Sequence, residues 1–222
     1  MRLTATLVAD GSSDSLLGPI LEWLLDQHLP IGSTLNLQVP EWGRLPDKIS
    51  VKTLPEKLLA ARLFFTASVY FVHRDVEKDG TWEKRSQEID QAIQRVFKSQ
   101  PPPYVRVIPV QMTETWLLHD EEAIRKAAEN PSGRDYLPLP SLRELETQKY
   151  AKTLLLTILR DASGLSGRKL QKFEAYERRR LHRLAALQQE TGFAVLRALP
   201  AFQALEQEVV ALVAAWQSSI TT

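Results

Sequence analysis

The stretch Leu7-Val8-Ala9-Asp10-Gly11-Ser12-Ser13-Asp14 joins a short apolar run to a helical pattern. Residues 3–9 are rich in side chains that suit a strand, and the apolar positions of 16–25 recur at helical spacing. Gly11 can adopt backbone conformations that are closed to other residues. The stretch therefore predicts a strand, a tight turn and a helix, an arrangement in which α/β proteins commonly bind a phosphate or a metal.

The alternation of strand and helix continues through the first half. A weaker strand is expected over 34–39, and Thr53-Leu54-Pro55-Glu56 has the spacing of a capping box that opens a helix. Val69-Tyr70-Phe71-Val72 is a continuous apolar run, which is typical of a strand buried on both faces. A helix marked by 89–97 and a strand over 105–110 follow. This order predicts an α/β fold with a parallel sheet flanked by helices.

The second half is helical in pattern, with helices expected over 150–160, 168–189 and 202–216. We therefore divide the chain into an α/β core over residues 1–128 and a C-terminal helical annex over 129–222. The annex is expected to pack on the core rather than to form an independent domain.

Composition limits the chemistry more than it identifies a partner. The 222 residues carry 28 Lys and Arg against 27 Asp and Glu, so any nucleic-acid surface must come from local clustering. The absence of cysteine excludes disulfides and thiolate metal sites, and a metal would need carboxylates, histidines or water. No apolar run is long enough to span a bilayer or to form a signal peptide, so we expect no membrane association and a cytoplasmic location.

Acidic side chains follow two of the expected strands, at Asp10 and at Asp75, with Glu77 two residues further on. If these strands are neighbours in a parallel sheet, their carboxylates converge at one edge. Magnesium binds such oxygens, and two ions can hold the attacking and leaving oxygens of a phosphodiester. The alternative is that these acids, like Asp14 and Asp79, only stabilise turns and helix starts.

Two further segments have alternative interpretations. Gly11-Ser12-Ser13 could cradle a phosphate at a helix amino terminus, or form a turn that needs no ligand. Glu114 could add a carboxylate to the same sheet edge, or stabilise a first helical turn. His73 is expected to be polar lining rather than a metal ligand, and Trp116 is expected in the core.

A basic stretch lies between residues 168 and 183, and Lys149 and Lys152 precede it. On one helix, such residues could contact a phosphate backbone. The alternative is a solvated helix face with local Glu–Arg pairs. The stretch contains Arg168, Lys169, Lys172, Arg178, Arg179, Arg180 and Arg183.

The order of these motifs resembles the Toprim catalytic fold of topoisomerases, primases and overcoming-lysogenization-defect-type nucleases. More closely, the chain is similar to an uncharacterised bacterial family of small Toprim-like proteins, the domain of unknown function 4276 family. The most specific match is Glu114-Thr115-Trp116-Leu117-Leu118. The other matches are Asp10-Gly11-Ser12-Ser13-Asp14, Arg74-Asp75-Val76-Glu77, Leu137-Pro138-Leu139-Pro140, Lys149, Lys152 and Arg178-Arg179-Arg180.

The resemblance implies a Toprim/Rossmann-like sheet that binds magnesium or manganese and cleaves phosphodiesters in nucleic acid. It implies metal ligands at Asp10, Asp75 and Glu77 and catalytic roles for these three and Glu114. Asp10 stands where such sites usually carry a glutamate. Relatives often accompany ATPases in bacterial defence loci, so the alternative is a non-catalytic nucleotide- or nucleic-acid-binding partner subunit of an ATPase. The residues expected to contact nucleic acid are Lys149, Lys152, Arg178, Arg179 and Arg180.

Overall fold

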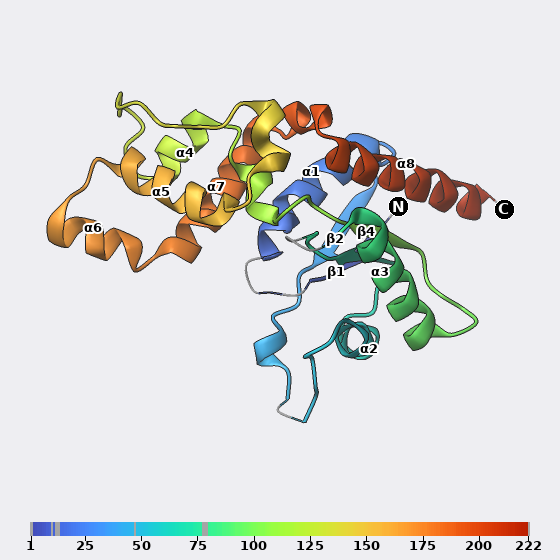
Figure 1. Cartoon of the computed structure of the whole chain (residues 1–222). Coiled ribbons are helices and arrows are strands. Elements are labelled where there is room, and N and C mark those ends of the chain that lie inside the picture. Colours follow the sequence, from blue (N-terminus) through green and yellow to red (C-terminus); the bar gives the residue numbers. More distant parts are fainter. Residues whose placement is uncertain (1, 10, 12–13, 47, 77–79, 222) are drawn as a thin grey trace.

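The computed structural model describes residues 2–9, 11, 14–46, 48–76 and 80–221 (Figure 1). Within these residues, four parallel strands form one sheet in the order β2-β1-β3-β4. The α/β fold with a parallel sheet flanked by helices, predicted from the alternating pattern, is confirmed. The strands are β1 (Arg2–Val8), β2 (Thr34–Gln38), β3 (Val69–His73) and β4 (Tyr104–Val107).

Helices cover both faces of the sheet and form the annex, and short 3-10 helices connect them. The helices are α1 (Leu17–His28), α2 (Leu54–Phe64), α3 (Trp82–Phe97), α4 (Glu121–Ala127), α5 (Ala151–Ser163), α6 (Gly167–Glu174), α7 (Glu177–Thr191) and α8 (Pro200–Thr221). The 3-10 helices are η1 (Asp14–Leu16), η2 (Trp42–Arg44), η3 (Thr113–Leu117), η4 (Leu142–Thr147) and η5 (Ala194–Ala198). No helix among the described residues combines the length and the apolar character that crossing a membrane requires.

The two faces of the sheet bury different sets of side chains. In β3, Tyr70 and Val72 join the apolar cluster of α2 and α3, whereas Val69 and Phe71 join the larger cluster of α1 and α8. This alternation follows from the two-residue period of a strand. Figure 1 shows α1 and α2 on opposite sides of the sheet. Burial on both faces explains why residues 69–72 are uniformly apolar.

The strand order determines where a ligand site can form. β1 pairs with β2 on one side and with β3 on the other, from Ala5 opposite Val69 to Val8 opposite Val72. The chain therefore moves from one side of β1 to the other after β2. In open parallel sheets, ligands bind beyond the carboxyl ends of the strands at such a switch point. The residues that follow Val8 and His73 leave the sheet at this edge.

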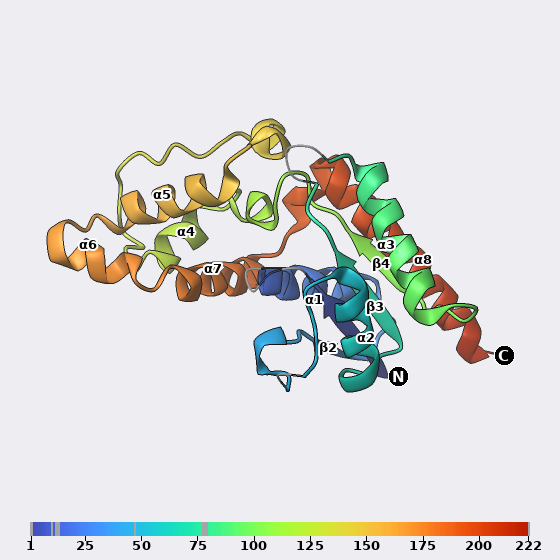
Figure 2. The same cartoon turned by 60° about the horizontal axis from the view of Figure 1, so that its bottom comes forward.

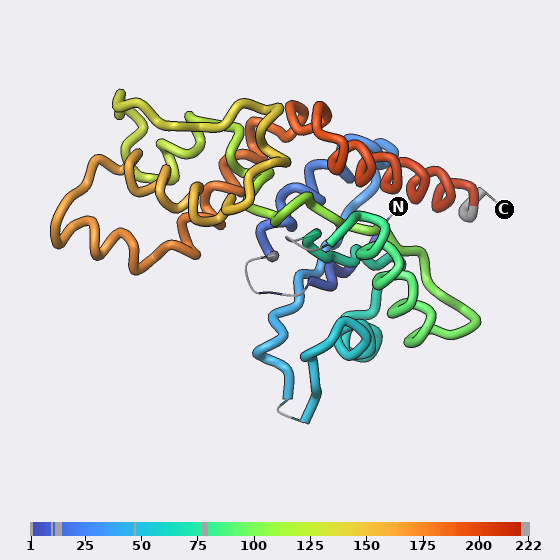
Figure 3. Tube along the Cα trace, viewed as in Figure 1, coloured from blue at the N-terminus to red at the C-terminus, as the bar shows by residue number. Residues whose placement is uncertain are grey.

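The helical annex extends from one end of the sheet, where α4 packs on α5 and α7 (Figure 2). The larger apolar cluster is continuous from the sheet into the annex, and it includes Leu155 of α5 and Leu184 of α7. Figure 3 follows the chain from the sheet into the annex and back along the sheet with α8. α8 packs on β4 and α1, so the last part of residues 129–222 covers the sheet itself.

The prediction of one helix over residues 168–189 is wrong, because α6 and α7 are separated at Ala175 and Tyr176. Phe173 at the end of α6 is buried, and the guanidinium of Arg180 lies 3.6 Å from the centre of its ring. Neither glycine nor proline marks the break. The basic stretch is therefore distributed over two helices instead of one.

Candidate functional site

The backbone pairing of β3 and β4 continues beyond the ends of both strands. The N–H of Arg74 donates to Val107 O at 3.1 Å, and the N–H of Val76 donates to Pro109 O at 3.2 Å. The side chains consequently keep alternating after β3. Arg74 and Val76 face α3, whereas Asp75 lies on the same side as His73.

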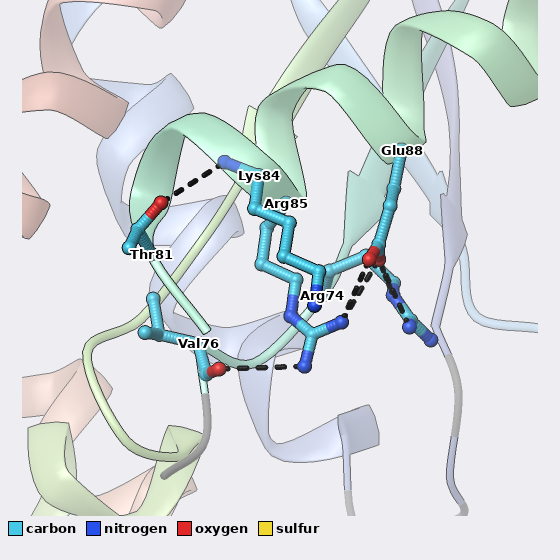
Figure 4. Close-up of polar contacts among 6 residues, drawn as sticks. All are labelled: Arg74, Val76, Thr81, Lys84, Arg85 and Glu88. Atoms are coloured by element: carbon cyan, nitrogen blue, oxygen red, sulfur yellow. Dashed lines mark hydrogen bonds and ion pairs between the residues drawn. The ribbon is translucent and has the colours of Figure 1, made fainter. Parts of the chain in front are cut away.

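Two arginines fix the turn that carries Asp75. Arg74 and Arg85 both point to the carboxylate of Glu88 on α3, at 3.1 Å and 2.9 Å from Oε2 (Figure 4). Arg85 also donates to Val76 O at 3.4 Å. Burial raises the pKa of Glu88, but hydrogen bonds from Arg85 and Arg74 outweigh this and lower the pKa below its usual value. The turn after β3 is thus tied to α3 by a charged cluster.

The carboxylate of Asp75 is oriented by a buried histidine. Nε2 of His73 lies 3.1 Å from Oδ1 of Asp75 and 3.4 Å from Oγ1 of Thr113. The side chain of His73 is 1% exposed and that of Asp75 is 23% exposed. Within the described residues, no contact engages Oδ2 of Asp75. His73 therefore fixes Oδ1 of Asp75, and Oδ2 is available to a ligand at the edge of the sheet.

The segment that follows β4 brings Glu114 to this edge. Glu114 is adjacent to Thr113 in η3 and is 4% exposed. Its Oε1 lies 3.7 Å from Nζ of Lys152, at the start of α5. The expected core position of Trp116 is confirmed, because this residue is fully buried and packs edge-to-face on Phe202. The buried indole anchors η3 and thereby places Glu114.

The contacts of His73 thus join the segment of Asp75 to Thr113 of η3, and Glu114, the next residue of η3, pairs with Lys152. Among the residues that the structure describes, no three His, Cys, Asp or Glu side chains form a group that could hold a metal ion. Four of the predicted site residues, Asp10, Ser12, Ser13 and Glu77, lie outside the described residues, as does Asp79.

A second concave region lies at the carboxyl end of β1, on the side of β2. It is a cavity of about 590 Å³. Gly11 and Arg178, both predicted from the sequence, line this cavity. Ser15 and His182 also line it, and they contact each other with 3.3 Å between Oγ and Nε2. The turn after β1 and the start of α7 therefore belong to one site.

The three consecutive arginines of α7 have three different environments. Arg178 is exposed and lines the cavity, and Arg179 is exposed on the helix surface. Arg180 packs over Phe173, and its Nη1 lies 3.0 Å from Oε1 of Glu129. Lys149 is exposed just before α5. The contacts of Arg180 hold α6, α7 and the end of α4 together.

Sequence reasoning missed several residues of the cavity. Lys57 of α2 is 5% exposed and lines it, together with Trp42, Arg44 and His182. The available signal was a lysine among the apolar positions of an amphipathic helix, where a charge needs a compensating environment. Trp42 and Arg44 lie together in η2, but both are far from Lys57 and His182 in the sequence, and no local pattern connects the three segments.

No protein-family model matches the chain, and neither a curated protein nor a solved structure matches it significantly. The Toprim resemblance therefore stays a prediction, and function has to be inferred from the two sites.

Proposed function

We propose that this chain is a magnesium-dependent protein that cleaves phosphodiesters in nucleic acid. The observation that carries the proposal is the parallel pairing of β1 with β3 at the switch point. This pairing makes the residues after Val8 and after His73 leave the same edge of the sheet. The motif residues Asp10 and Asp75 follow these two strands in the sequence.

The donor atoms of Asp75 fit magnesium. This ion prefers carboxylate oxygens, is held by one or two carboxylates and keeps several waters for phosphate oxygens. Oδ2 of Asp75 is available at a partly exposed position, while His73 holds Oδ1. Asp10 and Glu77 would be the further ligands, and manganese would accept the same oxygens. Bound magnesium supplies positive charge that neutralises the phosphate oxygens.

The remaining residues at this edge would position the substrate and the carboxylates. His73 keeps Asp75 in one orientation, as residues behind metal ligands do. Nζ of Lys152 lies 3.7 Å from Oε1 of Glu114 on a partly exposed side chain, and it would contact a phosphate of the substrate. Glu114 supports the site by holding Lys152 and by accepting a proton at Oε1.

The exposed cations of the annex would contact the nucleic-acid backbone. Lys149, Lys152, Arg178 and Arg179 are exposed, and phosphate contacts of this kind do not depend on base sequence. Arg180 was also predicted to contact nucleic acid. Its packing on Phe173 gives it a structural role in addition. Binding through these residues should weaken steeply as salt rises, because neutralising phosphates releases counterions.

Cleavage of single- and double-stranded DNA and RNA with magnesium or manganese tests the proposal. Asp75→Asn should reduce cleavage by more than roughly 100-fold, since even residues behind a ligand contribute 10–100-fold. Asp26→Asn, at an exposed position of α1, removes the same charge away from the site and should have no effect. Equal activity of the wild type and Asp75→Asn, or inactivity of the wild type on all substrates, would refute the catalytic proposal.

A non-catalytic subunit that binds nucleotides or nucleic acid for an ATPase is the second candidate. It is favoured by the internal pairing of both carboxylates, Asp75 with His73 and Glu114 with Lys152. In this case the wild type binds nucleic acid without cleaving it, and Asp75→Asn leaves binding unchanged. Both proposals are compatible with a role in bacterial defence. Co-purification with an ATPase tests that role.

A further inference from the structure

The two edges of the sheet differ in how they are protected. α8 packs on β4, and its Glu208 accepts the backbone N–H of Arg106. β2 is the other edge strand, and no strand of the described sheet pairs with its outer side. It packs on β1 and α1, and its residues are partly or largely exposed, whereas all of β3 is buried. One edge of the sheet is therefore open.

The open edge directs backbone groups away from the sheet. The N–H of Tyr70 donates to Pro103 O, so Tyr70 faces β4 with its backbone groups, and the alternation along a strand turns those of Phe71 to β1. The registers of β3 on β1 and of β1 on β2 carry this alternation across the sheet. As a result, the N–H and C=O groups of Leu35 and Leu37 point away from β1. These groups can pair with a strand from another molecule.

The sequence of β2 lacks the residues that usually prevent such pairing. Soluble proteins often place lysine, proline or another charge on an exposed edge strand. The strand Thr34–Gln38 has neither a charged residue nor a proline. Two exposed apolar side chains lie near it. Ile31 is in the turn before the strand, and Phe64 is near the end of α2. That end of α2 is next to the strand, because Nε2 of Gln38 donates to Thr66 O at 3.1 Å.

The strand is complementary to a second copy of itself. When two copies pair in antiparallel orientation with Asn36 opposite its own copy, Leu35 of each lies opposite Leu37 of the other. Both leucines are partly buried and pack on the larger apolar cluster, so the pairing extends this cluster across the junction. The carboxamide of Asn36 has both donors and an acceptor, and can therefore hydrogen-bond with its own copy. Within the described residues it makes no hydrogen bond.

We propose that β2 pairs with β2 of a second copy, antiparallel and centred on Asn36, and that the resulting homodimer has one continuous sheet. A two-fold axis perpendicular to the sheet relates the copies, and the same surface of each chain forms the contact. The α2 helices of the two copies then lie on the same face of the joined sheet. The contact uses the edge of β2, so it is independent of the phosphodiesterase proposal.

Sedimentation velocity of the full chain over a range of micromolar concentrations tests the proposal. We expect the wild type to form a dimer. Asn36→Lys places two like charges opposite each other at the axis and should weaken the dimer by roughly tenfold or more. Gln91→Lys adds the same charge at an exposed position of α3 and should leave the dimer unchanged. Circular dichroism verifies that each variant folds.

A charge pair tests the position of the axis. Asn36→Asp should also weaken the dimer, and an equimolar mixture of the Asn36→Lys and Asn36→Asp proteins should restore it, because opposite charges then meet. Hydrogen exchange at the N–H groups of Leu35 and Leu37 should slow as the wild-type concentration rises.

Three results would overturn the proposal. A monomeric wild type would mean that another protein, or none, covers this edge. Equal dimerisation of Asn36→Lys and the wild type would place the contact on another surface. Failure of the mixture to dimerise would exclude the register centred on Asn36.

Discussion

Nε2 of His73 lies 3.1 Å from Oδ1 of Asp75, two residues further along the same extended segment. The contact exists because β3 continues to pair with the segment after β4, which keeps both side chains on one side of the sheet. An aspartate held in this way loses little freedom when it binds a cation. The orientation of Asp75 should therefore depend on the imidazole.

His73→Phe removes Nε2 but keeps an aromatic ring of similar size in the buried position. We expect the affinity for Mn²⁺ to fall by roughly 10–100-fold, as for residues that orient a metal ligand. Asp75→Asn should lower it further. Isothermal titration with Mn²⁺ measures both effects without a substrate. Unchanged Mn²⁺ affinity in a folded His73→Phe protein would contradict the role of this histidine.

Glu208 of α8 protects the edge of the sheet. Its Oε2 accepts the backbone N–H of Arg106 at 2.7 Å, and its Oε1 lies 3.0 Å from Nη1 of the same residue. Glu208→Ala should cost about 1.5–3 kcal/mol in the free energy of unfolding, the range for hydrogen bonds to charged groups. It should also promote aggregation, because it opens the edge of β4. Chemical denaturation and light scattering measure the two effects, and Gln207→Ala, at an exposed position, should show neither.

His119 should make stability depend on pH. Burial lowers the pKa of His119 to about 4 from 6.5, and its ring packs on Phe193. Between these values the unfolded chain binds a proton that the folded protein does not, so stability falls as the pH drops from 6.5 to 4. The loss approaches about 3 kcal/mol at pH 4. His119→Phe should flatten this part of the curve of unfolding free energy against pH, and an unchanged slope would argue against a neutral buried imidazole.

Adjacent arginines of α7 should differ in their effect on stability. Arg180→Gln removes the packing on Phe173 and the ion pair with Glu129, and should cost about 1–2 kcal/mol. Arg179→Gln should stay within about 0.5 kcal/mol of the wild type, as exposed substitutions usually do. Urea denaturation of the two variants compares them directly. Equal losses would mean that Arg180 has no special structural role.

The sheet was predictable because its signals are local. The apolar run of 69–72 indicated a strand buried on both faces, and both hydrogen bonds of the capping box predicted at Thr53 are present. Element boundaries were less accurate. The strand expected over 105–110 ends at Val107, before Pro109, which has no N–H to donate to a ladder. The helix marked from residue 89 begins at Trp82, because Thr81 accepts a hydrogen bond from Lys84 N.

The sites were only partly predictable because they depend on tertiary contacts. Asp75 and Glu114 could be selected as acids after strands, but the contact of His73 with Asp75 requires pairing that continues beyond β3. The cavity depends on contacts such as Ser15 with His182, which are 167 residues apart. The break before α7 falls at Ala175 and Tyr176, next to the buried Phe173, and the sequence has no glycine or proline there that would predict it.

The contact between Arg106 and Glu208 joins residues that are 102 positions apart. During synthesis, roughly 5–20 s pass at typical elongation rates between the synthesis of β4 and that of the part of α8 that covers its outer edge. Through this interval the nascent sheet presents an unpaired strand, the kind of surface that chaperones recognise and that pairs with other chains. The order of segments along the chain thus makes the yield of folded protein sensitive to translation speed.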